Sequence, residues 1–391
     1  MKITSVQAFP IKIPRDLNDA RGTAGSPAAL AESQNEYRWA TNYRTLYSTK
    51  IETALIKVTT DSSLTGWGEA QSPVAPEIVC AIIKTILAPM LIGEDPLSHE
   101  RLWARMYSTM RARGHTGSFM LDAIGGIDTA LWDIKGKALG ARVCDMLGGP
   151  FLNDLPAYIS GLSGDDRAAR VAQAAEYQQR GFSAFKLFLD REPEDLLSLY
   201  DGLREALGAK ARVMVDALWR FEQAEAARFG RELDGRNAVW FEAPLKPEDV
   251  NGHARLAASV ETAIALGECW RTRWEMRPFF EAGAVEVFQP DIGRTGITEG
   301  MKLCALSELH NTPVAFHVSI GLGVQIAAAL HVAASVPNLM FVECNPKVWQ
   351  VADELLTAFL PVGAGVVGIP EGAGLGVEID EERLRPFIVA C

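Results

Sequence analysis

The sequence contains no uninterrupted run of about 18 apolar residues, so no membrane-spanning helix is predicted. Its first residues, MKITSVQAFPIKIPRDL, hold no long apolar stretch, and we expect no secretory signal peptide. The six cysteines form no CxxC pair, and a chain of 391 residues does not depend on disulfides for stability, so we expect them to be reduced and mostly buried. Together these absences favour a cytoplasmic protein without a membrane partner.

Long basic runs and the common nucleotide and hydrolase motifs are missing as well. No run of Lys and Arg exceeds two residues, and 38 basic against 49 acidic side chains give a net charge of −11, so we expect no nucleic-acid partner. The sequence has no P-loop, HExxH or GxSxG motif. GAGVVG at 363–368 matches GxGxxG, but GIPEGAGLG follows it instead of a helix, and this context excludes a dinucleotide site.

The first part of the chain predicts a small α+β domain, which we place at residues 1–120. Apolar alternation indicates strands at 1–13 and 51–59, and helical spacing returns at 76–92 and 98–111. Residues 16–48 are polar and rich in small side chains, which predicts a long loop of the kind that often forms a lid. Residues 66–73 are expected to be the end of a strand followed by a loop.

The second part, residues 121–355, predicts a TIM-type barrel. A strong amphipathic helix at 119–140 is followed by short apolar runs with helical segments between them. The eight runs are 156–160, 184–188, 213–217, 239–243, 264–268, 285–289, 314–318 and 340–344. Strands that alternate with helices imply a parallel sheet, and eight in succession favour closure into a barrel, here expected in the (β/α)7β form. Residues 356–391, rich in Gly and Pro, are expected to pack back on the first domain.

Six polar residues stand at near-constant spacing and follow six of these apolar runs. The steps between them are 26, 26, 23, 26 and 26 residues, for Asp216, Glu242, Glu268, Asp291, His317 and Glu343. One βα unit has about this length, and all strands of a barrel end at the same mouth, where catalysis takes place. A carboxylate after a strand is often only a helix cap, but caps favour Asp over Glu, and six in register indicate a shared site.

The residue types predict a metal-dependent acid–base site. Asp216, Glu242 and Glu268 at one mouth repel each other unless a hard cation binds, and oxygen ligands suit Mg²⁺. Alternatively, single carboxylates pair with Arg or Lys, for which Arg220, Lys246 and Arg271 are the candidates.

The remaining residues of the mouth suggest how a substrate is handled. Lys186 lies inside the apolar run AFKLF, where its ammonium could contact a substrate carboxylate, act as a base, or simply reach solvent. Asp291 and His317 end neighbouring strands, so the carboxylate could orient the imidazole as a general base. Glu343 could bond a second substrate oxygen or be a structural acid.

The sequence resembles the enolase superfamily, in particular its mandelate racemase-like group, over nearly the whole chain. The resemblance lies in GIDTALWDIKGKALG (126–140), GFSAFKLF (181–188), VDALW (215–219), WFEAPL (240–245), ALGE (265–268), QPDIGRTGIT (289–298), AFH (315–317) and PEGAGLGVEID (370–380). It implies a capping domain with two lid loops at about 16–45 and 66–78. It also implies Mg²⁺ at Asp216, Glu242 and Glu268, a general base formed by Asp291 and His317, and Glu343 as an electrophile. The shared chemistry of the group is abstraction of the proton α to a carboxylate, through an ene-diolate that the metal and Lys186 would stabilise.

Departures from the group's motifs bear on the reaction. Where the group usually has Lys-x-Lys, this sequence has Lys186-Leu187-Phe188, and where it has DxN, this sequence has Asp216-Ala217-Leu218. In the FEEP motif, Ala243 replaces the second acidic residue. Because Phe188 leaves one face of the α-carbon without a base, a two-base racemase is disfavoured. A one-base dehydration of a sugar acid to its 2-keto-3-deoxy acid, a hydro-lyase activity common in the group, is the leading hypothesis.

Other readings stay open at this stage. A racemase or epimerase with another second base, a cycloisomerase, and a metal-binding scaffold without turnover are the alternatives. We expect a homo-oligomer that acts on a mono- or dicarboxylate sugar acid. The sequence does not identify the sugar, which residues such as Arg21, Tyr37, Arg38, Tyr43, Arg44, His115 and Trp219 could select.

Overall fold

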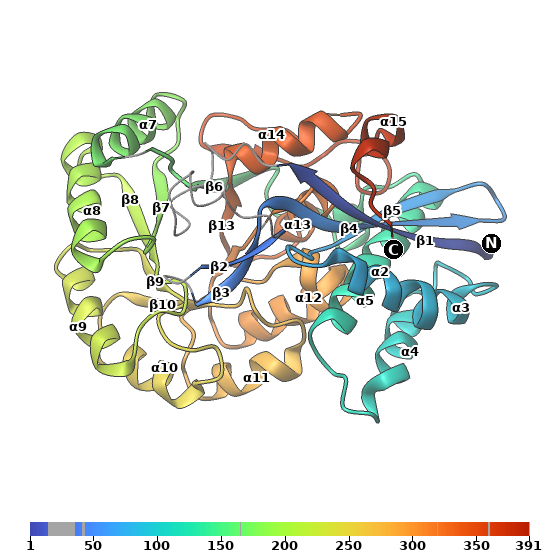
Figure 1. Cartoon of the computed structure of the whole chain (residues 1–391), viewed down its shortest axis with the longest axis horizontal. Helices are drawn as coiled ribbons and strands as arrows, with labels where there is room; N and C mark the ends of the chain where they lie inside the picture. Colours follow the sequence, from blue (N-terminus) through green and yellow to red (C-terminus); the bar gives the residue numbers. More distant parts are fainter. Residues whose placement is uncertain (15–35, 41–43, 165, 319, 359, 391) are drawn as a thin grey trace.

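The structure of the protein is a computed structural model, which describes residues 1–14, 36–40, 44–164, 166–318, 320–358 and 360–390. It divides visually into a barrel and an adjoining cap (Figure 1). None of the helices within the described ranges has the length and apolar character needed to cross a membrane.

A closed parallel barrel forms the larger part of the molecule. Its strands are β6 (Asp154–Ser160), β7 (Ala184–Phe188), β8 (Arg212–Asp216), β9 (Trp240–Glu242), β10 (Ala263–Leu266), β11 (Val287–Phe288), β12 (Val314–Phe316) and β13 (Leu339–Cys344). Each strand pairs with the next one along the chain, and β13 pairs in parallel with β6. This pairing closes the sheet, so the predicted barrel is confirmed.

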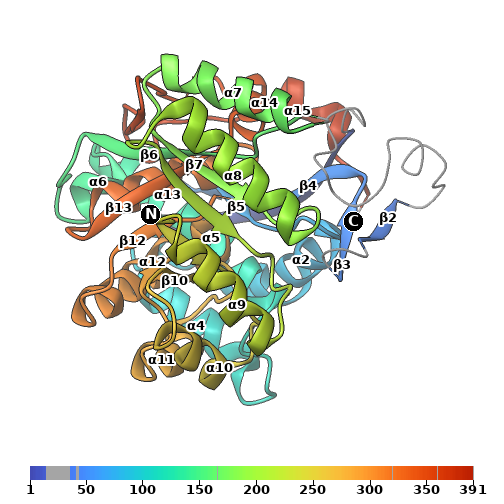
Figure 2. The same ribbon diagram turned by 90° about the vertical axis from the view of Figure 1, so that its left-hand side faces the viewer.

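Helices cover the outer face of the barrel, as Figure 2 shows for α7 to α11. They are α7 (Arg167–Gln179), α8 (Pro193–Leu207), α9 (Gln223–Asp234), α10 (Val250–Ala257), α11 (Arg273–Glu281), α12 (Ile292–Leu309), α13 (Val324–Ala334) and α14 (Pro346–Leu355). Local sequence fixes several of their starts. Asp166 accepts from Ala169 N at the start of α7, and Thr272 forms a capping box with Glu275 in α11.

An apolar ring fills the interior of the barrel below its mouth. One inward-pointing residue of each strand contributes to it: Tyr158, Ala184, Met214, Trp240, Ala265, Val287, Ala315 and Phe341. Because side chains alternate along a strand, the residue two positions further on points inward again, one step closer to the mouth. This alternation decides which residues form the site.

The cap contains an antiparallel sheet of β1 (Ile3–Pro14), β4 (Lys50–Thr60) and β5 (Thr65–Ala70). Its helical segments are α2 (Pro76–Ile82), the π-helical turn η2 (Ile83–Leu87), α3 (Ala88–Leu91), α4 (His99–Arg111), α5 (Phe119–Leu139) and α6 (Val143–Met146). Residues 65–70 thus form a full strand that pairs with β4, where the sequence suggested only a strand end and a loop.

The segment predicted to be one long loop contains regular structure in its second half. β2 (Tyr37–Ala40) and β3 (Thr45–Ser48) form an antiparallel hairpin, which lies in front of the junction between barrel and cap in Figure 1. Residues 15–35 and 41–43 lie outside the described residues. The loop prediction was therefore wrong for residues 37–40 and 45–48, because strand pairing between them supplies order that their polar composition does not reveal.

Close packing holds the elements of the cap together, and hydrogen bonds join the cap to the barrel. A Cβ on Gly68 of β5 would lie 1.9 Å from the carbonyl oxygen of Gly126 in α5, so only glycine permits this approach. Glu69, the next residue, accepts from Leu322 N at 2.7 Å and Gln325 N at 3.0 Å, at the start of α13. These contacts fix the cap against the barrel mouth.

The C-terminal segment contacts both parts. β14 (Val366–Gly368) pairs antiparallel with β6, while α15 (Glu381–Leu384) and the 3-10 turn η3 (Arg385–Phe387) lead to a bridge between Ile11 of β1 and Ile388.

Candidate active site at the barrel mouth

A polar layer lies directly above the apolar ring. Two positions beyond the ring residues stand Ser160, Lys186, Asp216, Glu242, Gln289, His317 and Glu343. Glu268 reaches the same region from one residue later in the chain, after Gly267 and beyond the end of β10. A Cβ on Gly267 would lie 2.5 Å from backbone atoms of Gln289, so the chain passes too close to β11 for a side chain there.

Lys186 lies at the centre of the predicted carboxylates. Its Nζ is 2.9 Å from Glu242 Oε1, 3.2 Å from Glu343 Oε1 and 3.8 Å from Asp216 Oδ2, and all four side chains are almost completely buried. Burial alone would lower the pKa of Lys186, but the charges of Glu242 and Glu343 outweigh it and raise that pKa well above the usual value. Lys186 is therefore held as a charged hydrogen-bond donor, which suits an electrophile better than a base.

The predicted dyad is present as a direct contact. His317 Nδ1 lies 2.8 Å from Asp291 Oδ2, and its Nε2 lies 2.9 Å from Glu268 Oε2. Burial opposes the charged imidazolium, yet Glu268 and Asp291 together raise the pKa of His317 well above its usual value. Burial likewise opposes the Glu268 carboxylate, but His317 brings its pKa down to about 2. For His317 to accept a proton, its contact with Glu268 has to open.

Glu343 completes the contact set on the opposite side of the mouth. Besides Lys186, it accepts from Val318 N at 3.0 Å. Burial would raise the pKa of Glu343, whereas the charges of Lys186 and His317 lower it below the usual range. The carboxylate is consequently ionised and links β7, β12 and β13.

Three further side chains hold the predicted ligands. Trp219 Nε1 donates to Glu268 Oε1 at 3.0 Å, while Trp240 Nε1 and Gln289 Nε2 donate to Glu242 Oε2 at 3.0 and 2.8 Å. We named Trp219 only as a possible specificity residue and did not predict the other two. Trp240 lies two residues before Glu242, and Gln289 lies two residues before Asp291. Because side chains alternate along a strand, these positions could have predicted that both side chains point toward the site.

The loop that carries Trp219 adopts an unusual backbone conformation. Leu218 and Trp219 both have positive φ, 55° and 61°, which is rare for residues other than glycine. Leu218 N donates to Asp216 Oδ1 at 2.9 Å, and Trp219 N donates to Ala243 O at 2.7 Å. Strained backbone of this kind is found where surrounding contacts over-determine it, often at functional sites. Here it turns the indole N–H toward Glu268.

The alternative pairing of the three carboxylates is wrong for the cations we considered. Arg271 pairs with Asp122, Lys246 with Glu222, and Arg220 lies nearest to Glu192 among the carboxylates, at 3.6 Å. The cations that do contact the predicted ligands are Lys186 and His317. Both belong to the mouth itself.

The donor set fits a hard divalent cation in chemistry. All three predicted ligands offer carboxylate oxygens, and burial together with the charge of Glu242 raises the pKa of Asp216 well above its usual value. A divalent cation would relieve this repulsion. As the side chains stand, however, no group of three acidic, His or Cys residues within the described ranges is arranged around one metal position. Glu242 and Glu268 would each have to exchange a present partner for the metal.

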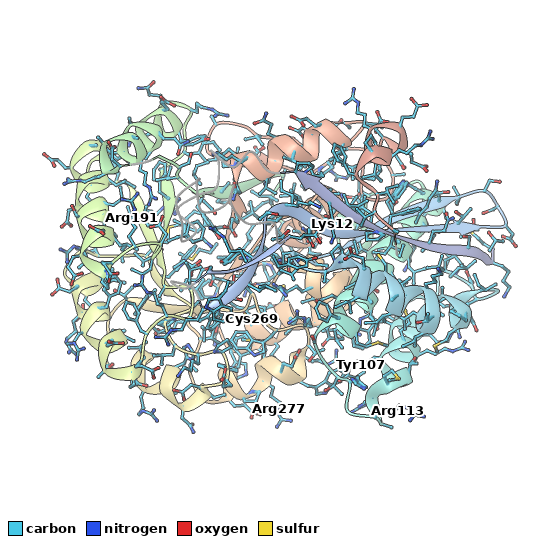
Figure 3. All side chains as sticks on the ribbon, in the orientation of Figure 1. Lys12, Tyr107, Arg113, Arg191, Cys269 and Arg277 are labelled. Atoms are coloured by element: carbon cyan, nitrogen blue, oxygen red, sulfur yellow. The ribbon has the colours of Figure 1, made fainter. Side chains whose placement is uncertain are left out.

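The cap residues proposed for specificity divide into several groups. Tyr37 Oη lies 3.0 Å from Lys12 Nζ and 3.1 Å from Glu52 Oε2, in a cluster within the cap. Arg44 and His115 are exposed, Arg38 is partly buried, and Arg21 and Tyr43 lie outside the described residues. Figure 3 labels Lys12 of this cluster, and also Cys269, the partly buried neighbour of Glu268.

Comparison with known proteins agrees with this fold. Residues 40–148 match the sequence model of the mandelate racemase / muconate lactonizing enzyme N-terminal domain, and residues 169–383 match that of the enolase C-terminal domain-like family. A D-galactarolactone cycloisomerase from Agrobacterium fabrum is 36% identical over 85% of this chain and 90% of its own length. A D-galactonate dehydratase from Xanthomonas oryzae is 33% identical over 87% of this chain and 92% of its own length.

Solved structures give the same result. A member of the enolase superfamily from Agrobacterium tumefaciens superposes with a TM-score of 0.93 at 32% identity, with 99% of both chains covered. A racemase from Streptomyces coelicolor with bound magnesium reaches 0.85 at 25% identity, with 99% of this chain and 100% of its own covered. The protein is thus an enzyme-type barrel with a carboxylate-lined mouth. The chain belongs to the enolase superfamily, and within it to the mandelate racemase-like group.

Proposed function

We propose that this protein is a Mg²⁺-dependent enzyme that removes the proton α to the carboxylate of a sugar acid and then expels a group from the β-carbon. The contact that carries the proposal is the 2.8 Å bond between His317 Nδ1 and Asp291 Oδ2. It orients Nε2 of His317 toward the mouth, where Nε2 can act as a single base on one face of the α-carbon. Members of the superfamily use a Lys or His base together with Mg²⁺. A scaffold without turnover would not require this dyad.

Asp216, Glu242 and Glu268 would hold the metal, which supplies positive charge to the substrate carboxylate when bound. The ammonium of Lys186, kept charged by its carboxylate partners, would donate to a carboxylate oxygen as negative charge develops there. Metal ligation by Glu268 competes with the contact between Glu268 Oε2 and His317 Nε2. Release of this contact would free Nε2 to take the α-proton.

Two leaving groups fit the chemistry that follows. In the dehydration that the sequence predicts, the 3-hydroxyl leaves as water after His317 returns its proton, and the enol becomes a 2-keto-3-deoxy acid. In a cycloisomerisation, a ring oxygen leaves but stays attached elsewhere in the molecule. Phe188 is compatible with the cycloisomerisation as well as with the dehydration, since it places no acid on the far face of the substrate.

Proton NMR of candidate acids with enzyme and Mg²⁺ in D₂O tests the proposal. Formation of a 2-keto-3-deoxy acid with loss of water identifies a dehydratase, and an isomer of the substrate that is not its epimer identifies a cycloisomerase. Exchange of the α-proton with inversion and nothing else would overturn the elimination step. EDTA should abolish turnover and added Mg²⁺ should restore it.

A further inference from the structure

A polar cluster in the cap joins segments that are far apart in the chain. Its centre is Lys12 of β1, whose side chain needs partners because the residue is only 7% exposed. Lys12 Nζ lies 2.7 Å from Glu77 Oε1 and 3.0 Å from Glu36 Oε2. It also donates to Tyr37 Oη at 3.0 Å and lies 3.9 Å from Glu52 Oε2. One ammonium group thus connects β1 with the start of β2, with β4 and with α2.

Glu52 fixes both ends of the hairpin that β2 and β3 form. Tyr37 and Ser48 stand directly opposite each other in this hairpin, and both hydroxyl groups donate to the Glu52 carboxylate. Ala75 N, in the segment that leads into α2, donates to Glu52 Oε2 at 2.9 Å. Because the Glu52 side chain is fully buried, its charge depends on the nearby ammonium of Lys12 for compensation.

The same hairpin borders the barrel mouth. Tyr47 of β3, the neighbour of Ser48, lines a cavity of about 380 Å³ that also reaches Lys186. Ile13, the neighbour of Lys12, lines this cavity from β1. Helix α14 contributes polar and charged side chains to the same lining: Lys347, Gln350 and Glu354. A shift of the hairpin would therefore change the shape of the cavity in which a substrate meets Lys186.

From these contacts we infer that Lys12 is a positioning residue, which holds the hairpin of β2 and β3, and with it Tyr47, against the cavity at the barrel mouth. The inference deepens the proposed function, because this is the cavity in which the sugar acid would bind. Burial alone would lower the pKa of Lys12, but hydrogen bonds to its partners, Glu77 foremost, raise that pKa above the usual value. The ammonium is therefore charged at neutral pH and can compensate Glu52.

Hydrogen exchange followed by mass spectrometry measures how firmly the hairpin is held, and it needs no substrate. In Lys12→Met the amides of β2 and β3 should exchange at least roughly tenfold faster than in the wild type, while those of β5 should change less than about twofold. Lys12→Arg keeps the charge, so its rates in the hairpin should stay within about threefold of the wild type. Lys57→Met is the matched control. Lys57 also belongs to the cap sheet, but it pairs with the exposed Glu381, and its loss should leave the hairpin unchanged.

Steady-state kinetics test the link from the hairpin to the site, with whichever of D-galactonate and D-galactarolactone the wild type turns over. Lys12→Met should raise KM at least roughly fivefold and change kcat less than about threefold, because the hairpin would help to bind the substrate without taking part in the chemistry. Turnover of no sugar acid by the wild type would refute the proposed function. The hydrogen-exchange experiment would still decide whether Lys12 holds the hairpin.

Three results would overturn the inference. One is exchange in β2 and β3 of Lys12→Met within about twofold of the wild type. Another is an equal increase in β5, which would mean that Lys12 stabilises the cap as a whole. The third is an unchanged KM in a variant whose hairpin exchanges faster. Should Lys12→Met fail to fold, Tyr37→Phe serves instead. It removes the hydroxyl that bonds both Lys12 and Glu52, and it should speed exchange in the hairpin at least roughly threefold.

Discussion

Replacement of Lys186 by methionine should destabilise the metal-free protein more than any single surface change. Met has a similar length but no charge, so Glu242, Glu343 and Asp216, at 2.9, 3.2 and 3.8 Å, would lose their shared ammonium. Removing one partner of a buried ion pair costs about 3–5 kcal/mol. We expect the upper part of this range, because three buried carboxylates share the one cation.

Urea unfolding at pH 7.5, without metal, measures this loss. Lys246→Met is the matched control, since Lys246 pairs with Glu222 at 2.9 Å where both side chains are more than half exposed. Exposed pairs of this kind contribute little to stability, because water and salt screen their charges. Mg²⁺ should restore part of the stability of Lys186→Met, because it would supply positive charge to two of these carboxylates, Asp216 and Glu242, but it should not restore activity. A loss below about 1 kcal/mol without metal would refute the idea that Lys186 neutralises the buried carboxylates.

Three other predictions concern the metal ligands and the joint between cap and barrel. Trp219→Phe removes the indole N–H that donates to Glu268 Oε1. The Mg²⁺ affinity measured by calorimetry should therefore fall by about 10-fold, while the melting temperature should change little. An unchanged affinity would show that Trp219 does not position Glu268. Glu268→Gln should weaken Mg²⁺ binding more strongly than Trp219→Phe, and the reverse order would place the metal elsewhere. Burial raises the pKa of Glu69 and of Asp128 to about 7, so the folded state binds more protons than the unfolded chain between their ordinary values and pH 7. The stability that these two carboxyls contribute is fully present when the pH is below their ordinary pKa values, and it is lost as the pH rises through about 7. For Glu69 alone this loss amounts to roughly 3 kcal/mol in the free energy of unfolding. Urea unfolding at pH 5.5 and pH 8 checks the sign, and greater stability at pH 8 would contradict it.

The barrel was predictable because each strand carries its own local signal. Apolar runs such as AFKLF (184–188) alternate with amphipathic helices, and a polar residue at the end of successive strands points to one mouth. The contact between Asp291 and His317 followed from adjacent strands. The match of spacing and strand order therefore located the candidate site without any knowledge of tertiary contacts.

The contacts that the sequence did not reveal cross the mouth or depend on unusual backbone. The Glu268–His317 contact joins β10 and β12, which are not neighbours in the sheet, and the bond from Trp219 to Glu268 requires positive φ at two residues. The hairpin of β2 and β3 is stabilised by pairing within a polar segment. No local pattern encodes these features.

Several expectations stay predictions. They are the roles of the metal ligands and catalytic residues, the domain limits at 120 and 355, the homo-oligomer and the cytoplasmic location. Each has a direct physical test, and the first is the most informative, because the proposed chemistry depends on it.

The most direct test of the account is solvent-deuterium incorporation at the α-carbon by His317→Asn. Asn keeps approximate size and polarity but cannot accept the proton, and loss of a general base lowers a rate by roughly 10²–10⁴-fold. We predict that this variant still binds Mg²⁺, since His317 is not a proposed ligand, and that it incorporates no measurable deuterium into a sugar acid that the wild type exchanges. Exchange at a rate near that of the wild type would show that the base lies elsewhere and would contradict the one-base mechanism.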